Sequence, residues 1–433
     1  MPKPSVRVLR IESIMRWQSR IRVLQLFSAA VVDQILLSGA NFLVGFLLIR
    51  NTSDADYGLY VLVQSAVLLL ITAQTSWLST PLAVLAPKRT DDVKRRMVGA
   101  VEAAQRRFLR RVGMAAICVP ALGFFLKFWD AFSATLIAVA VLAGWAALQR
   151  EYVRRVLLIY SRANTLLGVD AVYVVIFVGG TLFAVFGPKH AVIWAVVAMT
   201  VAGWVGAKAA HAALGREPGW VAGEASGVLR ELRRLGIWAS VGALTYWLFS
   251  QSFNYMLASR LDLKAVADVN AARLLIMPAM VFTIGMESLL LPKSAGWLAS
   301  IGLRSLLSRL AAIFVAVALL ELGYFALVWI FRDWLSGDFL HKVIHDRDRL
   351  LTLWACIALI GLLRIVFQTA LVALEPLKQM AGITSVSAVL SLAIMWFGIN
   401  WWGPAGVLIG QIAGDLLVIG GYAVILRQAS ART

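Results

Sequence analysis

Residues 350–372 read LLTLWACIALIGLLRIVFQTALV, a long apolar run broken by a single charge at Arg364. A helix needs ~20 apolar residues to cross the hydrocarbon core of a bilayer, so this run is long enough to span a membrane. A charged side chain at mid-membrane depth costs about 2.5–3.5 kcal/mol to insert. The stretch therefore predicts a transmembrane helix, and it predicts that Arg364 faces a cavity or a partner.

The rest of the chain repeats this pattern. Of its 433 residues, 61% are hydrophobic and 15% are charged, whereas a soluble protein carries about 25% charged residues. Such a composition excludes a soluble enzyme, a secreted disulfide scaffold and a disordered chain. Because backbone polar groups in lipid must be satisfied internally, we expect an all-α polytopic membrane protein. The apolar runs predict twelve spans, at 28–49, 59–85, 112–129, 132–149, 166–186, 191–214, 236–258, 269–291, 306–331, 350–372, 380–401 and 404–426.

The distribution of positive charge predicts the orientation of these spans. With the N-terminus in the cytoplasm, 30 of the 41 Lys and Arg residues fall in cytoplasmic segments and 9 in external ones. Cytoplasmic loops carry an excess of Lys and Arg, so both termini are expected in the cytoplasm. This bias accounts for most of the net charge of +18, and no nucleic-acid partner is expected. The basic loop 86–111 is expected to contact anionic membrane lipids.

Residues at matching positions indicate that the chain consists of two repeated halves. Arg50 ends the first span and Arg260 ends the seventh, and Pro81 and Pro292 follow near the ends of the next spans. We therefore expect a basic cytoplasmic segment at 1–27, a six-helix bundle at 28–214, a cytoplasmic linker at 215–235, and a second six-helix bundle with a short cytoplasmic tail at 236–433. Halves of like orientation form a parallel repeat, with a cleft between them that a solute can enter.

Deeply placed polar residues mark the candidate site. Arg364, Glu321 and Asp415 lie near the middle of their spans, and Gln368 lies one helical turn after Arg364. Arg364 and Asp415 share a depth, so a structural ion pair explains them as simply as transport does. In the functional alternative, Arg364 and Arg273 bind a phosphate or diphosphate, because the planar guanidinium group binds oxyanions bidentately. Asp415 or Glu321 is then the expected ion-coupling site, since protonation would change the charge of the cavity.

Other polar residues allow two interpretations. Arg273 lies near the external end of its span, where its side chain can also reach the interface. Asp33, Gln34 and Asn41, together with Ser38, form a polar stripe along the first helix. The stripe either lines a cavity or forms a hydrogen-bonded seam between helices. Asp33, Gln34, Asn41, Arg273, Arg364 and Gln368 are together the expected substrate-binding residues.

The sequence carries no catalytic motif. It contains no Gly-rich nucleotide-binding loop, no hydrolytic Ser motif and no acidic metal cluster on a loop, and its two cysteines, Cys118 and Cys356, lie in apolar runs. The longest external loop, 332–349, is too short for a catalytic domain. We therefore expect a protein that is not an enzyme and that needs no cofactor or metal ion.

Two stretches carry a resemblance to a known family. Residues 33–50, DQILLSGANFLVGFLLIR, are followed by a short acidic turn and by Tyr57-Gly58-Leu59-Tyr60. This stretch resembles the opening of bacterial polysaccharide flippases of the O-antigen (Wzx-like) type, within the multidrug/oligosaccharidyl-lipid/polysaccharide exporter (MOP) superfamily. Residues 266–273, VADVNAAR, are similar to the start of the family's eighth helix. The turn 51–53, Asn-Thr-Ser, departs from the family's usual Leu-Gly-Pro.

The resemblance extends along nearly the whole chain through its spans and paired halves. It implies a V-shaped, MATE-like pair of six-helix bundles in the inner membrane of a bacterium. The protein would flip a polyprenyl-diphosphate-linked oligosaccharide by alternating access during cell-surface polysaccharide biosynthesis. Its partners would be this lipid-linked oligosaccharide, membrane lipids and the polysaccharide biosynthesis machinery. Two alternatives stay open: a drug/cation antiporter of the same superfamily, and a membrane-embedded glycan polymerase or ligase.

Overall fold

The computed structural model describes residues 32–187, 189–215, 225–374 and 376–431. Every regular element in these ranges is a helix, which confirms the all-α fold class. The predicted segment 1–27, residues 216–224 of the predicted linker, and residues 432–433 of the tail lie outside the described residues. The helices are Val32–Asn51, α2 (Asp54–Gln74), η1 (Thr75–Ser79), α3 (Thr80–Leu85), η2 (Ala86–Lys88), α4 (Asp91–Phe125), α5 (Ala131–Ile159), α6 (Ala163–Phe186), α7 (Ala191–Leu214), α8 (Ala225–Arg260), α9 (Leu263–Ile330), α10 (Arg332–Trp334), η3 (Leu335–Phe339), α11 (Arg347–Leu374), α12 (Leu377–Trp402) and α13 (Ala405–Ser430).

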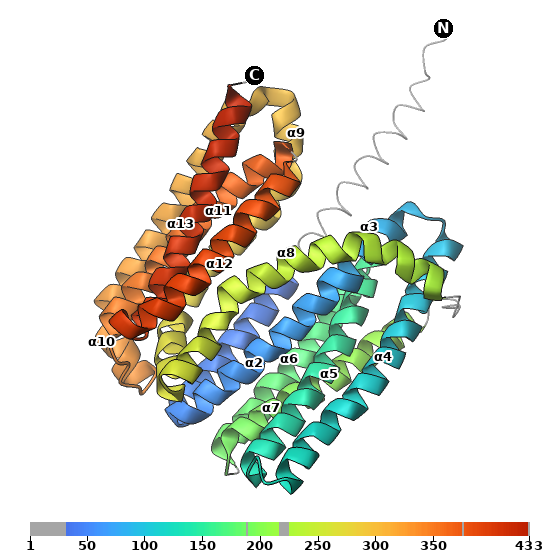
Figure 1. Ribbon diagram of the computed structural model, residues 1–433, viewed down its shortest axis with the longest axis vertical. Helices are drawn as coiled ribbons and strands as arrows, with labels where there is room; N and C mark the ends of the chain where they lie inside the picture. Colours follow the sequence, from blue (N-terminus) through green and yellow to red (C-terminus); the bar gives the residue numbers. More distant parts are fainter. Residues whose placement is uncertain (1–31, 188, 216–224, 375, 432–433) are drawn as a thin grey trace.

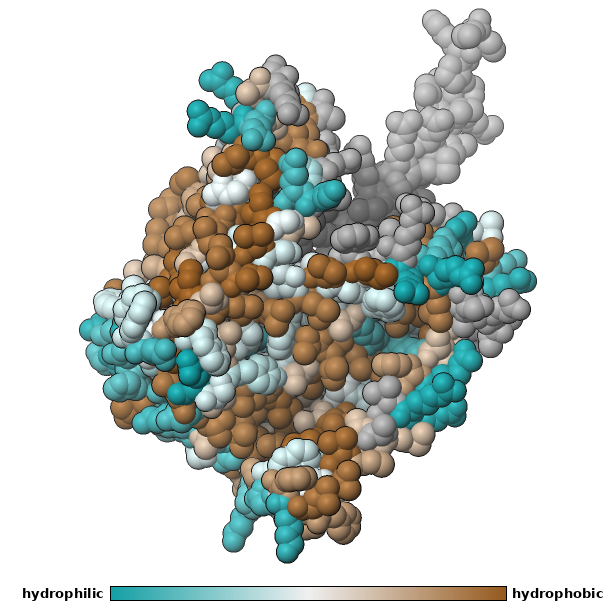
Figure 2. All heavy atoms as spheres, viewed as in Figure 1, coloured by the Kyte–Doolittle hydropathy of each residue, from teal (hydrophilic) through white to brown (hydrophobic). Residues whose placement is uncertain are grey.

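The membrane character predicted from composition is confirmed. In the part of the chain that the structure describes, nine helical segments are long and apolar enough to cross a membrane. The other three predicted spans lie on α4, α8 and the first part of α9. On the face shown in Figure 2, apolar side chains cover much of the bundles and polar ones lie mainly towards their ends. This distribution is typical of a multi-pass membrane protein.

Two helices are longer than the sequence predicts. The expected loop between spans 269–291 and 306–331 is largely helical: α9 consists of two helices that meet at a kink at Gly302, whose φ of 75° and ψ of 169° are not helical. A positive φ favours glycine, and here it marks the change of direction. Similarly, α5 continues to Ile159, past the predicted end at 149. The polar residues that follow an apolar run mark where the chain leaves the membrane, but the helix can continue beyond them into water.

The helices form two bundles with α8 beside both (Figure 1). The helix Val32–Asn51 and α2–α7 belong to the first bundle, and α9, α11, α12 and α13 form the second. Helix α8 packs against α2, η1 and α4 as well as against α9 and α12. It therefore connects the bundles by its packing as well as by its place in the chain.

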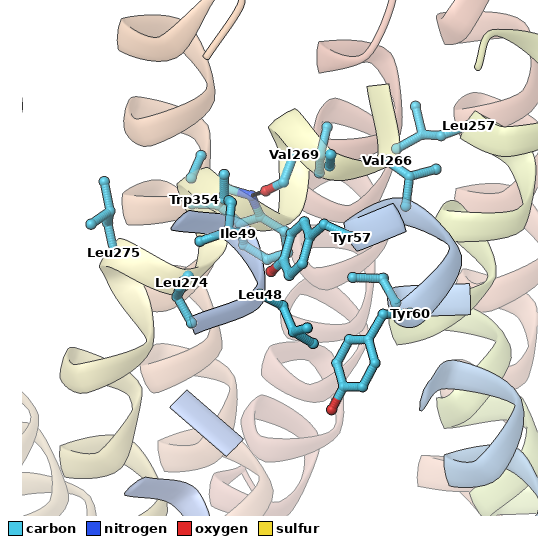
Figure 3. Close-up of a cluster of buried hydrophobic side chains, with 14 of the residues drawn as sticks. Leu48, Ile49, Tyr57, Tyr60, Leu257, Val266, Val269, Leu274, Leu275 and Trp354 are labelled. Carbon is cyan, nitrogen blue, oxygen red and sulfur yellow. Dashed lines mark hydrogen bonds between the residues drawn. The ribbon is translucent and has the colours of Figure 1, made fainter. Parts of the chain in front are cut away.

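A buried apolar cluster joins the two halves near residue 50. Side chains of the first half meet those of α8, α9 and α11 in Figure 3; the labelled residues are Leu48, Ile49, Tyr57, Tyr60, Leu257, Val266, Val269, Leu274, Leu275 and Trp354. Gly58 allows a close approach of the two halves, because a Cβ atom there would collide with the backbone carbonyl of Leu263. The Tyr57–Tyr60 motif of the sequence is thus part of the contact between the halves.

Polar contacts close the same end of the molecule, which we call the Arg50 end. The Arg50 guanidinium donates to the Phe339 carbonyl at 3.0 Å, and Lys342 donates to the Thr52 carbonyl at 2.8 Å and pairs with Asp54 at 2.7 Å. These contacts tie the segment between α9 and α11 to the turn between the first helix and α2. Towards α3 and the C-terminus, by contrast, the two bundles are apart (Figure 1).

Candidate functional site

A cavity of about 640 Å³ lies among α8, α9, α11, α12 and α13. Its volume is within the range of about 300–1,000 Å³ that is common for small-molecule sites. Polar and aromatic side chains line much of it: Thr245, Tyr246, Phe249, Ser250, Arg273, Thr283, Trp354, Arg364, Gln368, Thr384, Ser385, Gln411, Asp415 and Tyr422. Four residues predicted as site residues from the sequence, Arg273, Arg364, Gln368 and Asp415, are therefore brought together.

Arg364 and Asp415 form the ion pair that their equal depth suggested. Arg364 Nη1 lies 2.8 Å from Asp415 Oδ1, and the two side chains are 16% and 4% exposed. The guanidinium also lies over the rings of Tyr246 at 5.4 Å and Phe249 at 5.9 Å, while its Nε is buried without a hydrogen-bond partner. Asp415 thus balances the charge of Arg364 and leaves most of its five N–H donors available.

Arg273 has no such counter-charge. It lines the cavity with its guanidinium 5.3 Å from the ring of Trp354, and its Nε is buried without a hydrogen-bond partner. Among the described residues, no carboxylate lies within ion-pair distance of it. The Arg273 side chain lines the cavity, which favours the binding-site interpretation over a side chain extended to the membrane interface. Two arginines and one carboxylate give the cavity wall a net positive charge.

Glu321 lies directly behind the cavity wall. Its side chain is fully buried, and the Thr283 hydroxyl donates to its Oε1 at 2.6 Å. Thr283 itself lines the cavity, so one hydroxyl group separates the Glu321 carboxyl from the cavity space. The sequence identified Glu321 by its depth, but nothing in the sequence marked Thr283.

The polar stripe of the first helix lies elsewhere. Asp33 is buried and pairs with Arg154 of α5 at 2.7 Å, and Arg154 also bonds to Asp170 at 2.6 Å and to Glu151 at 3.0 Å. Arg150 pairs with Asp170 at 2.5 Å. These charges hold the first helix to α5 and α6, which favours the interpretation of a seam between helices for Asp33. Gln34 and Asn41 are exposed and do not line the cavity described above, and Gln34 donates to Ser38.

Comparisons with known proteins agree with this architecture. An inward-facing multidrug resistance MATE family transporter of the MOP superfamily superposes with a TM-score of 0.73 over 92% of this chain and 95% of that one, at 14% identity. The chain has the MATE transporter fold. An outward-facing MATE family transporter gives a TM-score of 0.64 at 13% identity, covering 95% of this chain and 96% of that one.

A third solved structure is a MOP superfamily transporter from Pyrococcus furiosus, for which "reverse polarity of binding pocket suggests different function". It matches with a TM-score of 0.67 at 12% identity, over 95% of this chain and 96% of that one. No protein-family model matches the sequence. No curated protein matches it either.

Within this MATE fold, the cavity differs in position from the cleft expected between the halves. All of its lining residues come from α8 and the helices that follow it. The sequence also missed its aromatic members, Tyr246, Phe249, Trp354 and Tyr422. Aromatic residues are frequent at interfaces and in cores, so no local signal separates those that line a cavity. Gln411, one helical turn before Asp415, is an additional polar residue that helical spacing could have indicated.

Proposed function

We propose that this protein flips a polyprenyl-diphosphate-linked oligosaccharide across a bacterial inner membrane by alternating access. The observation that carries this proposal is the cavity with Arg273 and Arg364, in which Arg273 has no acidic partner among the described residues. A buried charge without a partner is costly unless a ligand supplies the opposite charge. A phosphate or diphosphate group supplies it, and guanidinium groups bind such groups bidentately.

The composition of the cavity also suits a glycan head group. Hydroxyl and amide side chains, among them Thr245, Gln368, Thr384 and Gln411, line the same cavity as the aromatic rings. Such groups can exchange hydrogen bonds with sugar hydroxyls and take the place of water. The lipid tail can meanwhile stay in the hydrocarbon core of the bilayer, so that it is never exposed to water during flipping.

The closed Arg50 end fits one state of an alternating-access cycle. The positive-charge bias of the loops predicts that this end is external and that both termini are cytoplasmic. The contacts of Arg50 and Lys342 would then seal the external side, and the bundles are apart on the other side. Under this orientation the state is the one that accepts substrate from the cytoplasmic leaflet.

A drug/cation antiporter is the second candidate, because multidrug resistance transporters are among the structural matches. A site for organic cations would require a carboxylate in the cavity without a basic partner. Among the residues that line the cavity, the carboxylate of Asp415 is paired with Arg364 and Arg273 has no acidic partner, while the carboxyl of Glu321 lies behind Thr283, outside the lining. The charge of the cavity therefore favours an anionic substrate.

The test is flipping of a fluorescent polyprenyl-diphosphate oligosaccharide in proteoliposomes. Charge-assisted hydrogen bonds contribute about 1.5–3 kcal/mol each, so Arg273→Ala is expected to reduce flipping about 10- to 150-fold. Arg260→Ala is the matched control, because Arg260 also lies over a tryptophan ring, Trp396 at 4.0 Å, but does not line the cavity. Equal flipping by the wild type and Arg273→Ala, or efflux of cationic drugs that requires the cavity, would overturn the proposal.

A further inference from the structure

The buried carboxylates of this protein differ in their counter-charges. Asp415 is paired with Arg364, and Asp33, Glu151 and Asp170 are each paired with an arginine of α5. Glu321 is fully buried, yet no basic side chain of the described ranges lies within ion-pair distance of it. It therefore differs from Asp33, Glu151, Asp170 and Asp415, whose protonation would break an ion pair.

The hydrogen bonding of Glu321 leaves room for a proton. Its Oε1 accepts from the Thr283 hydroxyl at 2.6 Å, and its Oε2 is buried without a partner in the part of the chain that the structure describes. A proton can therefore be added at Oε2 without breaking a hydrogen bond or an ion pair. The Thr283 hydroxyl can rotate, because a threonine hydroxyl both donates and accepts.

The position of Glu321 links this proton to the cavity. Thr283 lines the cavity and its hydroxyl donates to Glu321 Oε1, so the hydroxyl can pass its proton to Oε1 and take another from the cavity, after which the carboxyl donates to the Thr283 oxygen. The charged and titratable groups that face the cavity from the packed helices are Tyr246 on α8, Arg273 on α9, Arg364 on α11, and Asp415 and Tyr422 on α13. Glu321 contributes a negative charge behind this wall, close to where an anion would bind.

We propose that Glu321 is the proton-coupling residue of the cavity: it takes up a proton when an anionic group binds beside Arg273 and Arg364. This inference rests on the proposed anion site and identifies which of the buried carboxylates responds to its occupation. Neutral Glu321 no longer offsets the positive charge of the arginines, so the anion binds more tightly. By linkage, the bound anion favours the protonated carboxyl by the same factor.

Calorimetry on the full-length protein in detergent tests this coupling. The probe is inorganic sulfate, whose charge stays constant between pH 5 and 8, titrated in buffers that differ in ionisation enthalpy. This measurement gives the number of protons taken up per bound anion as well as the affinity. For the wild type we expect proton uptake approaching one per sulfate and an affinity that rises at least about fivefold from pH 8 to pH 5.

Three variants make the test specific. Glu321→Gln, which imitates the neutral carboxyl, is expected to bind sulfate with the wild-type affinity of pH 5 at every pH and to take up no proton. Thr283→Val keeps the carboxyl but removes its hydrogen-bond donor, so the carboxylate form is less stabilised. More of the carboxyl is then protonated before sulfate binds, and fewer protons are taken up per bound sulfate. Glu231→Gln removes a carboxyl that pairs with Arg89, with both side chains more than 40% exposed and outside the cavity, and is expected to behave as wild type.

The outcomes separate this inference from the proposed function. If sulfate binding requires Arg273 but Glu321→Gln takes up as many protons as the wild type, Glu321 is not the coupling residue and the anion site stands. If the wild type binds no sulfate, or if Arg273→Ala binds it equally well, the anion site itself is wrong, and the coupling fails with it.

Discussion

The Arg364–Asp415 ion pair offers a quantitative test of how the cavity is built. Arg364 Nη1 and Asp415 Oδ1 are 2.8 Å apart, and only 16% and 4% of the two side chains are exposed. Removing one partner of a buried pair costs about 3–5 kcal/mol, because the remaining charge is left uncompensated. We expect Asp415→Asn to fall near the lower end, at about 3 kcal/mol, because Arg364 faces a cavity that water can enter.

Two comparisons show whether the uncompensated charge is the cause. Replacing both residues with apolar ones, Arg364→Met with Asp415→Leu, removes both charges and is expected to be more stable than Asp415→Asn alone. Sulfate should stabilise Asp415→Asn more than it stabilises the wild type, since the anion also replaces the lost carboxylate. A ligand at 100 times its Kd stabilises a protein by about 2.7 kcal/mol.

The assay is thermal or denaturant-induced unfolding of the purified protein in detergent, followed by tryptophan fluorescence. Asp333→Asn is the control, because Asp333 pairs with Arg347 at 2.7 Å but its side chain is 76% exposed; exposed pairs contribute about 0–1 kcal/mol. The reasoning is refuted if Asp415→Asn unfolds like the wild type, or if the double variant is less stable than the single one.

Three further predictions concern the scaffold. Gly410→Ala should destabilise the protein by about 1–3 kcal/mol, because the added Cβ would collide with the Met395 backbone. Gly420→Ala, where the added Cβ meets open space, should not destabilise it. Unfolding of the two variants in detergent compares their stabilities. Arg154→Met should lower the free energy of unfolding by about 3–5 kcal/mol in the same assay, because it leaves the charges of Asp33, Glu151 and Asp170 undercompensated. Arg349→Met, which removes the more exposed pair with Asp346, is the control. Equal stability of the two variants would contradict the ion-pair seam between the first helix, α5 and α6. Burial, and the nearby carboxylate of Asp54, raise the pKa of Asp268, just ahead of the span 269–291, from 3.8 to about 6. Because folding favours the protonated form, the contribution of Asp268 to the free energy of unfolding is complete below pH 4 and is lost as the pH rises through 6. The wild type should therefore gain stability relative to Asp268→Asn between pH 7 and pH 5. A stability difference between the two proteins that does not change with pH would argue against this.

The sequence predicted the helices better than their ends. Apolar runs located the spans because lipid requires continuous helices of a minimum length. They did not show that the segment between the spans 269–291 and 306–331 is helical up to a kink at Gly302, or that α5 extends to Ile159. For the same reason Arg150 and Arg154 were assigned to a loop, whereas the structure places them in the ion-pair seam with Asp33 and Asp170.

The candidate site was predictable where a residue type is costly in lipid. Arg273, Arg364 and Asp415 stood out by charge and depth, and the structure brings them to one cavity. Thr283 did not stand out, because a threonine hydroxyl in a membrane helix can satisfy its hydrogen bonding at a backbone carbonyl of its own helix. Gln34 and Asn41 show the opposite case, since helical spacing predicted a stripe but could not tell which face the rest of the protein covers.

Photo-crosslinking measures the occupied site most directly. The probe is a polyprenyl diphosphate with a diazirine beside its diphosphate group, added to the protein in proteoliposomes and mapped by mass spectrometry. We predict crosslinks to the segments of α9 and α11 around Arg273 and Arg364, and their loss when unlabelled diphosphate lipid is in excess. Crosslinks confined to Val32–Asn51 or to the lipid-facing sides of the bundles would contradict an anion site in this cavity.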